Sequence, residues 1–213
     1  SGKNAYRLTD AALAVVLAFG SGLAYEAAVA DFKKRFGELS TAYRGTRELH
    51  RVPLVLPDGK ELSLSAGEHN VLQAAIVGDF SPRFAPGARV LYIGNTADKH
   101  VIMEAEAFAR LGVTLTEHDK FPDVILFDLK RGWLFLVEAV TSHGPVSPKR
   151  HRELEAVFGK CAASRVYVTA FPDAATFRRY AADIAWETEV WLADNPDHMI
   201  HFNGDKFLGP HIV

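Results

Sequence analysis

The stretch Phe121–Val140, FPDVILFDLKRGWLFLVEAV, has the pattern of an antiparallel β-hairpin. Two apolar runs rich in β-branched and aromatic residues, Val124–Phe127 and Trp133–Val137, flank a short polar link that ends in glycine. If the turn is centred between Lys130 and Arg131, residues whose numbers sum to 261 are pairing partners. The turn then fixes which residues of the two strands lie opposite each other.

Two acids interrupt this otherwise apolar hairpin. In the register set by the turn, Asp123 lies directly opposite Glu138, and both side chains project from the same face. Directly opposed Cβ atoms are roughly 4.5–5.5 Å apart, and two carboxylates there repel each other unless a positive charge lies between them. Mg²⁺ is held by one or two carboxylates together with waters and substrate phosphates. We therefore predict a magnesium site for phosphodiester cleavage, provided that neither acid has a cationic partner of its own. The alternative is an edge hairpin whose acids lie in water.

The composition is that of an ordinary soluble globular protein. The chain has 213 residues, of which 48% are hydrophobic and 23% charged, enough for one domain with a buried core and a small appended element. A net charge of −2 gives no general attraction to nucleic acid, so a local basic strip must supply it. The single cysteine, Cys161, excludes an internal disulfide and a cysteine-based zinc site, and it favours a reducing, cytoplasmic location. The apolar run Ala11–Phe19 is too short to cross a bilayer, which takes about 20 residues.

The N-terminal part predicts a small helical appendage. A first helix ends at Gly20-Ser21-Gly22, and a second helix over Tyr25–Phe36 carries apolar residues at helical spacing. Residues 40–50 are polar and typical of a linker. We interpret residues 1–45 as an element for packing or dimer contact and residues 46–213 as the main domain.

From residue 51 onward, the pattern predicts an α/β fold with a mixed β-sheet flanked by helices. A small hairpin turns at Pro57-Asp58-Gly59-Lys60, a helix runs from a capping box at Ser65 to about Val77, and a loop covers Phe80–Gly87. Arg89–Ile93 is expected to be a buried strand and His100–Leu111 a helix. Further strands are expected at Val113–Leu115, Arg165–Ala170, Glu189–Ala193 and Met199–Phe202, and further helices at Pro148–Phe158 and from Asp173 to about Trp186.

Two features around His100–Leu111 have alternative interpretations. Gly94, between the strand and the predicted helix, is weakly similar to a dinucleotide-binding turn, which needs three glycines where this chain has one. On the predicted helix, Glu104 lies among mostly apolar neighbours and could point at the hairpin, as could Glu106. The alternative for each acid is a solvated helix face.

A basic helix start follows the hairpin. Ser147 is a favourable cap and Pro148 a favourable first residue, and Lys149–Arg152 (KRHR) brings basic side chains to the positive end of the helix dipole. An anion such as a phosphate is expected there. The alternative is a solvated basic turn.

Longer strings around these residues resemble the BsuBI/PstI type II restriction endonucleases of the P-D-(D/E)-x-K nuclease superfamily. Phe121-Pro122-Asp123, followed by Glu138 one hairpin later, resembles the nuclease core. The likeness spans about residues 50 to 210 and is weak over residues 1–45, where members of the family carry a larger region used in DNA recognition. The other matching strings are Leu134–Arg150, Val168–Asp173, Asp183–Trp191 and Asp197–Gly204.

The resemblance implies a nuclease-like catalytic domain over residues 46–213. It further implies Mg²⁺-dependent cleavage of double-stranded DNA at a palindrome, CTGCAG in the family, by a homodimer. Asp123 and Glu138 match the metal-binding acids of the family. Glu104 is expected to complete the metal shell through a water molecule.

One position departs from the family pattern. Val140 stands two residues after Glu138, where the family has a lysine. We expect Lys149 to take over the role of that lysine, with Lys99 and Lys120 as weaker candidates. The alternative hypothesis is a module on a nuclease scaffold that binds DNA or a protein partner without cutting.

Contacts with DNA are expected from polar and basic side chains near the site. Arg, Lys and Asn can reach phosphates or the edges of bases in the major groove. The candidates are His143, Lys149, Arg150, Arg152 and Asn203.

Overall fold

The computed structural model describes residues 8–49, 51–94, 100–114 and 120–202. The chain forms two compact units, Ser1–His50 and Arg51–Val213. Asn203 and Lys99, which the sequence suggests as site residues, lie outside the described part of the chain. Within that part, no helix combines the length and apolar character that crossing a membrane requires.

The first unit consists of two helices, α1 (Asp10–Leu17) and α2 (Leu23–Leu49). The Thr9 side chain caps α1 by accepting a hydrogen bond from the Ala12 main-chain N–H. The predicted linker over residues 40–50 is wrong, because α2 continues through it. This stretch contains no proline, and one glycine costs a helix only about 1 kcal/mol.

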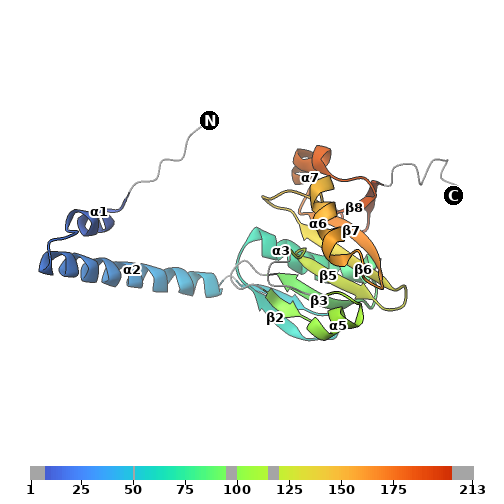
Figure 1. Cartoon of the computed structure of the whole chain (residues 1–213), viewed down its shortest axis with the longest axis horizontal. Coiled ribbons are helices and arrows are strands. Elements are labelled where there is room, and N and C mark those ends of the chain that lie inside the picture. The colour runs from blue at the N-terminus through green and yellow to red at the C-terminus, as the bar shows by residue number, and fades with distance from the viewer. Residues whose placement is uncertain (1–7, 50, 95–99, 115–119, 203–213) are drawn as a thin grey trace. The chain divides into compact units, whose positions relative to one another are not determined.

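The second unit contains a mixed seven-stranded sheet, as the sequence predicts, with the strand order β4-β3-β5-β6-β7-β8-β9 (Figure 1). The central strands β6, β7 and β8 run parallel, and the other neighbours pair antiparallel. The strands are β3 (Arg89–Gly94), β4 (His100–Met103), β5 (Val124–Asp128), β6 (Trp133–Ala139), β7 (Ser164–Phe171), β8 (Thr188–Leu192) and β9 (Met199–Phe202).

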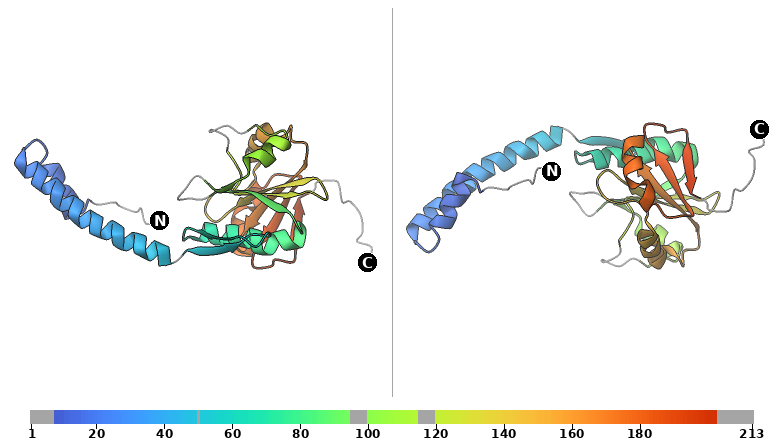
Figure 2. Two further views of the ribbon diagram at one scale, coloured as in Figure 1. Left: turned by 90° about the horizontal axis from the view of Figure 1, so that it is seen from below. Right: turned by 90° about the horizontal axis from the view of Figure 1, so that it is seen from above.

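Two layers cover the two faces of the sheet (Figure 2). The side chains of a strand alternate between these layers. Val124 and Leu126 of β5 belong to one core cluster, and Ile125 belongs to the other. The first layer holds the hairpin β1 (Val52–Val55) and β2 (Glu61–Leu64), α3 (Glu68–Ala75), a π-helical turn (Ile76–Phe80) and α4 (Ser81–Phe84). The opposite layer holds α5 (Ala105–Arg110) and α6 (Pro148–Phe158), while α7 (Ala174–Tyr180) and a 3₁₀ turn (Ala181–Asp183) follow β7.

The β5–β6 hairpin has the register predicted from the sequence. The ladder runs from Val124 opposite Val137 to Asp128 opposite Trp133. Gly132 closes the turn with φ of 65°, a conformation that glycine adopts without strain. One step beyond the ladder, this register sets Asp123 against Glu138.

The predicted helix over His100–Leu111 is wrong at its first half. His100–Met103 forms the edge strand β4, and the helix α5 begins only at Ala105. The β-branched residues Val101 and Ile102 favour a strand, and Ile102 pairs with Ile93 of β3. Tertiary pairing therefore overrides the helical periodicity.

The predicted capping box at Ser65 does not form. Gly67 occupies the N-cap of α3 without a side-chain bond, and the Ser65 hydroxyl instead accepts a hydrogen bond from Asn70 Nδ2 at 2.7 Å. The chain also stays helical to Phe84, where the sequence predicts a loop. Buried residues of the π-helical turn, Ile76, Val77 and Phe80, hold it against the sheet.

Candidate functional site

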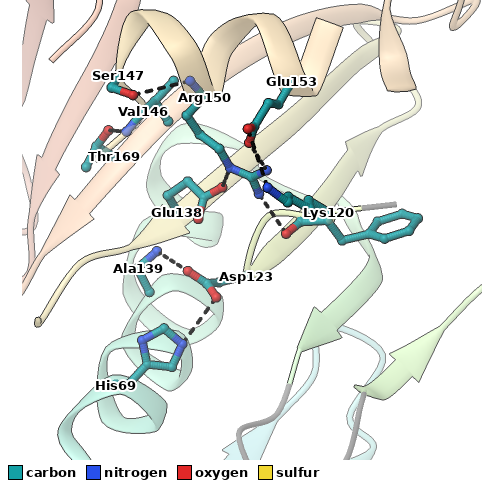
Figure 3. Close-up of polar contacts among 11 residues, drawn as sticks. His69, Lys120, Asp123, Glu138, Ala139, Val146, Ser147, Arg150, Glu153 and Thr169 are labelled. Carbon is teal, nitrogen blue, oxygen red and sulfur yellow. Dashed lines mark hydrogen bonds and ion pairs between the residues drawn. The ribbon is translucent and has the colours of Figure 1, made fainter. Parts of the chain in front are cut away.

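Asp123 and Glu138 lie side by side at the end of the hairpin, between α3 and α6 (Figure 3). Main-chain groups on both sides fix Asp123. The Gly94 N–H donates to its carbonyl oxygen at 2.9 Å, and the Ala139 N–H donates to its Oδ2 at 2.7 Å. Glu138 lies one residue before the end of β6 and directs its carboxylate toward α6 (Figure 3).

Arg150 is the cation that the structure brings to Glu138. Its Nε donates to Glu138 Oε1 at 2.7 Å, and both side chains are largely buried, with exposed fractions of 17% and 13%. A second nitrogen donates to the Phe121 carbonyl at 2.8 Å, and a third lies 3.4 Å from Glu153. The Ser147 hydroxyl caps α6 by accepting from the Arg150 N–H, which orients the first turn of the helix.

His69 is the corresponding partner of Asp123, and the sequence analysis does not identify it. It lies on α3, and its Nε2 is 3.2 Å from Asp123 Oδ1. The hydrogen bond to Asp123 raises the pKa of His69 above its ordinary value, against the effect of burial. No motif links His69 to the hairpin, because 54 positions of sequence separate it from Asp123.

Burial and the neighbouring carboxylate both affect the protonation of Glu138. Burial, followed by the negative charge of Asp123, raises the pKa of Glu138 to about 7, although Arg150 acts in the opposite direction. Burial and the same two carboxylates also raise the pKa of the Tyr92 hydroxyl. Both shifts favour the protonated, uncharged forms of Glu138 and Tyr92.

The condition placed on the magnesium prediction, that neither acid has a cationic partner of its own, is not met at Glu138, which contacts Arg150, and Asp123 contacts His69. The contacts leave room for a further cation. Arg150 bonds to Oε1 of Glu138, and each carboxylate oxygen can accept more than one contact.

The structure does not bring Glu104 to this site. Its carboxylate lies 2.7 Å from Arg89, on the part of β3 that pairs with Phe127 near the hairpin turn. Asp123 lies at the opposite end of the hairpin, four residues from Phe127, which is roughly 13 Å by the strand rise. Glu104 is displaced because the segment before it is a strand rather than a helix.

Lys149 is also not brought to the two acids. Its side chain is 81% exposed, and its Nζ lies 4.0 Å from Glu153. Lys120, a weaker candidate, lies 3.5 Å from the same carboxylate. Val140 stands where the family has lysine, and it is buried in an apolar cluster. The cation beside Glu138 is therefore Arg150 of α6 and not residue 140.

The other predicted DNA contacts differ in accessibility. His143 and Arg152 are exposed, and His143 contacts the Ser142 hydroxyl at 3.1 Å. Arg150, in contrast, is engaged by oxygen atoms of the protein itself.

The donor set fits a hard divalent cation. Within residues 8–49, 51–94, 100–114 and 120–202, no group of three or more Asp, Glu, His or Cys side chains could hold a metal. Two carboxylates on adjacent strands are nevertheless what Mg²⁺ uses when waters and phosphate oxygens complete its shell. Asp123 and Glu138 are the residues that would hold such an ion.

Comparison with known proteins identifies the family to which the chain belongs. A family model described as the BsuBI/PstI restriction endonuclease domain matches residues 52–205. The type II restriction enzyme BsuBI of Bacillus subtilis is 46% identical over 169 residues, which cover 79% of this chain and 54% of that enzyme. The type II restriction enzyme AplI of Arthrospira platensis is 28% identical over 216 residues, which cover 98% of this chain and 66% of that enzyme.

A solved structure shares the fold. The SdaI restriction endonuclease superimposes with a TM-score of 0.73 at 41% sequence identity, covering 96% of this chain and 64% of SdaI. The chain thus spans about half to two thirds of the length of the relatives that it matches.

Proposed function

Since the chain belongs to the BsuBI/PstI restriction endonuclease domain family, we propose that it supplies the catalytic domain of a type II restriction endonuclease, which hydrolyses phosphodiester bonds in double-stranded DNA. The observation that carries this proposal is the pair of adjacent carboxylates, Asp123 and Glu138, at the end of a rigid hairpin. The proposal assigns the catalytic domain to residues 46–213.

In the proposed reaction, Asp123 and Glu138 hold Mg²⁺. When bound, such an ion lowers the pKa of a coordinated water and polarises the phosphate. The main-chain N–H of Ala139 and the side chain of His69 hold Asp123, and Arg150 holds Glu138. These contacts keep the two carboxylates together before the substrate arrives.

Arg150 replaces Lys149 as our candidate for the cation of the site. An arginine guanidinium stays protonated at any pH that proteins encounter, so it stabilises negative charge and does not act as a base. Located beside Glu138, its positive charge can stabilise the negative charge that increases on the phosphate during hydrolysis. Lys149 and Lys120, which are exposed and lie 4.0 and 3.5 Å from Glu153, are candidates for contacts with the DNA backbone.

We further propose a palindromic DNA substrate and a dimeric assembly. A palindromic DNA site is matched by a protein with two-fold symmetry, so we propose a homodimer. CTGCAG, the site of the family, is the first sequence to test. His143 and Arg152 are exposed and remain candidates for DNA contacts.

Digestion of a supercoiled plasmid that carries CTGCAG tests the proposal. With Mg²⁺ we expect cutting by the wild type and a loss of at least about 100-fold for Asp123→Asn and Glu138→Gln, as is typical when a preorganised charge-stabilising group is removed. Lys160→Gln, a change at an exposed lysine beyond α6, is the matched control and should cut like the wild type. Equal cutting by all four proteins would contradict the proposal.

A specific observation favours a second candidate, a module that binds DNA without cutting it. Glu138 pairs with Arg150, and Asp123 pairs with His69 when the imidazole is protonated, so the negative charge of the site is offset in part without any ion. This candidate predicts a shift of DNA in a gel with Ca²⁺ but no product with Mg²⁺. Any cutting that requires Asp123 excludes it.

A further inference from the structure

Helix α3 brings His69 and Gln73 next to Asp123, although neither belongs to the hairpin. The two residues are one turn apart and share a side of the helix. His69 Nε2 lies 3.2 Å from Asp123 Oδ1, and Gln73 Nε2 lies 3.5 Å from the main-chain oxygen of Asp123. This side of α3 therefore contacts both the carboxylate and the backbone of the acid.

His69 contributes a contact that main-chain groups do not provide. The Ala139 N–H fixes Oδ2 of Asp123, but the terminal torsion of an aspartate is broad, so one bond leaves the carboxylate free to turn. A second contact at Oδ1 fixes its plane. His69 has an exposed fraction of 27%, so this contact lies at the edge of the site and not deep in the core.

Gln73 indicates that this face of α3 is not arranged for stability alone. Its side chain is fully buried, yet among the described residues its Oε1 has no hydrogen-bond partner. A buried polar atom without a partner destabilises a fold, and most proteins avoid it. An apolar residue would pack here at lower cost, so a polar residue beside Asp123 points to a role in the site.

We propose that His69 is a positioning residue, which holds the Asp123 carboxylate in the orientation needed to share a divalent ion with Glu138. The inference rests on the proposed function, because it assumes that Asp123 binds the ion. Groups behind a metal ligand fix its orientation, and their removal typically weakens metal binding about 10–100-fold.

Isothermal titration of the full chain with Mn²⁺ tests this role without DNA. We expect His69→Leu to bind about 10–100-fold more weakly than the wild type. His69→Gln, which keeps an N–H donor, should recover most of the affinity. Asp123→Asn should bind no ion at this site. His198→Leu is the matched control, because His198 is exposed and precedes the edge strand β9, so its affinity should equal that of the wild type.

The outcomes separate the inference from the proposed function. Unchanged affinity in folded His69→Leu, together with lost affinity in Asp123→Asn, overturns the inference and leaves the proposed function intact. If His69→Gln binds Mn²⁺ as weakly as His69→Leu does, the inference is also overturned, because the hydrogen bond to Asp123 would then not contribute to binding. Equal affinity in the wild type and Asp123→Asn overturns the proposed function. Circular dichroism verifies folding, and His69→Ser replaces His69→Leu if the latter does not fold.

Discussion

Arg150 connects three parts of the protein through one side chain. It bonds to Glu138 on β6, to the Phe121 carbonyl before β5 and to Glu153 on its own helix. Breaking a buried ion pair leaves the remaining charge without a partner, which costs more than the pair itself contributes. The stability of the site and its chemistry therefore depend on the same guanidinium.

Arg150→Ala should lower the free energy of unfolding by roughly 3 kcal/mol, because Glu138 loses its partner in a largely buried place. The same variant should lose DNA cleavage by at least about 100-fold. Urea denaturation and plasmid digestion measure the two effects. Lys149→Ala, a change at the neighbouring and highly exposed residue, should alter stability by less than about 0.5 kcal/mol. A similar loss of stability in the two variants would show that the contacts of Arg150 contribute no more than an exposed side chain does.

At this scale, the sequence identifies the acids but not their partners. Asp123 and Glu138 follow from the hairpin register, which local pattern determines. The choice between Lys149 and Arg150 depends on which direction the first turn of α6 faces, since adjacent helical residues point about 100° apart. His69 reaches Asp123 only through the tertiary fold, so no local signal identifies it.

Among the elements, the β5–β6 hairpin sets the geometry of the site through its turn. Asp128 Oδ1 accepts hydrogen bonds from the main-chain N–H groups of Lys130 and Arg131, at 2.9 and 3.2 Å, and Oδ2 accepts from Arg131 Nε. The Arg131 guanidinium also lies over the ring of Trp133, 4.4 Å from its centroid. The turn thereby fixes the register that sets Asp123 against Glu138.

The hydrogen bond from Arg131 lowers the pKa of Asp128 below its ordinary value. A carboxyl whose pKa is depressed in the folded state contributes stability above its unfolded pKa, near 4, and loses this contribution as the pH falls through the folded value. Asp128→Asn should therefore lower the thermal midpoint clearly at about pH 6 and much less at about pH 2.5. Differential scanning fluorimetry of both proteins measures this. A difference between the two proteins that does not change with pH would contradict the assignment.

Local pattern predicts elements well where it agrees with the tertiary contacts. The hairpin, the Ser147 cap with Pro148 and the strand β9 form as expected. His100–Met103 forms a strand and not the expected helix, because it pairs with β3. Phe80 is helical and not part of a loop, because it is buried against the sheet. Such non-local contacts are not visible in a short window of sequence.

In the whole molecule, the core belongs to the second unit. The three apolar clusters draw their buried members from Leu54 through Trp191, and none of residues 8–37 of the first unit is buried. The largest fully buried side chain, Trp191, contacts Phe80 of the π-helical turn edge to face, at 5.7 Å. The scaffold of the site is therefore complete without the first unit.

Residues 51–213 expressed alone should fold cooperatively and unfold within a few degrees of the full chain, because no core residue is removed. Circular dichroism on heating measures both midpoints. Loss of the cooperative transition in the shorter protein would mean that the first unit contributes to the core.

The mixed α/β fold follows from the order of predicted elements and from the family resemblance, and the structure confirms it. The separation into layers does not follow from periodicity. It depends on which face of the sheet each helix covers, and a buried strand such as Val124–Asp128 is apolar on both faces.

The central claim is that Asp123 and Glu138 share one divalent ion. The most direct test is a crystal of the full chain soaked in Mn²⁺ and measured at a wavelength where manganese scatters anomalously. We expect one anomalous peak within about 2.5 Å of an oxygen of each carboxylate. A site without a peak, with the contact between Arg150 and Glu138 unchanged and Mn²⁺ bound elsewhere, would contradict the claim.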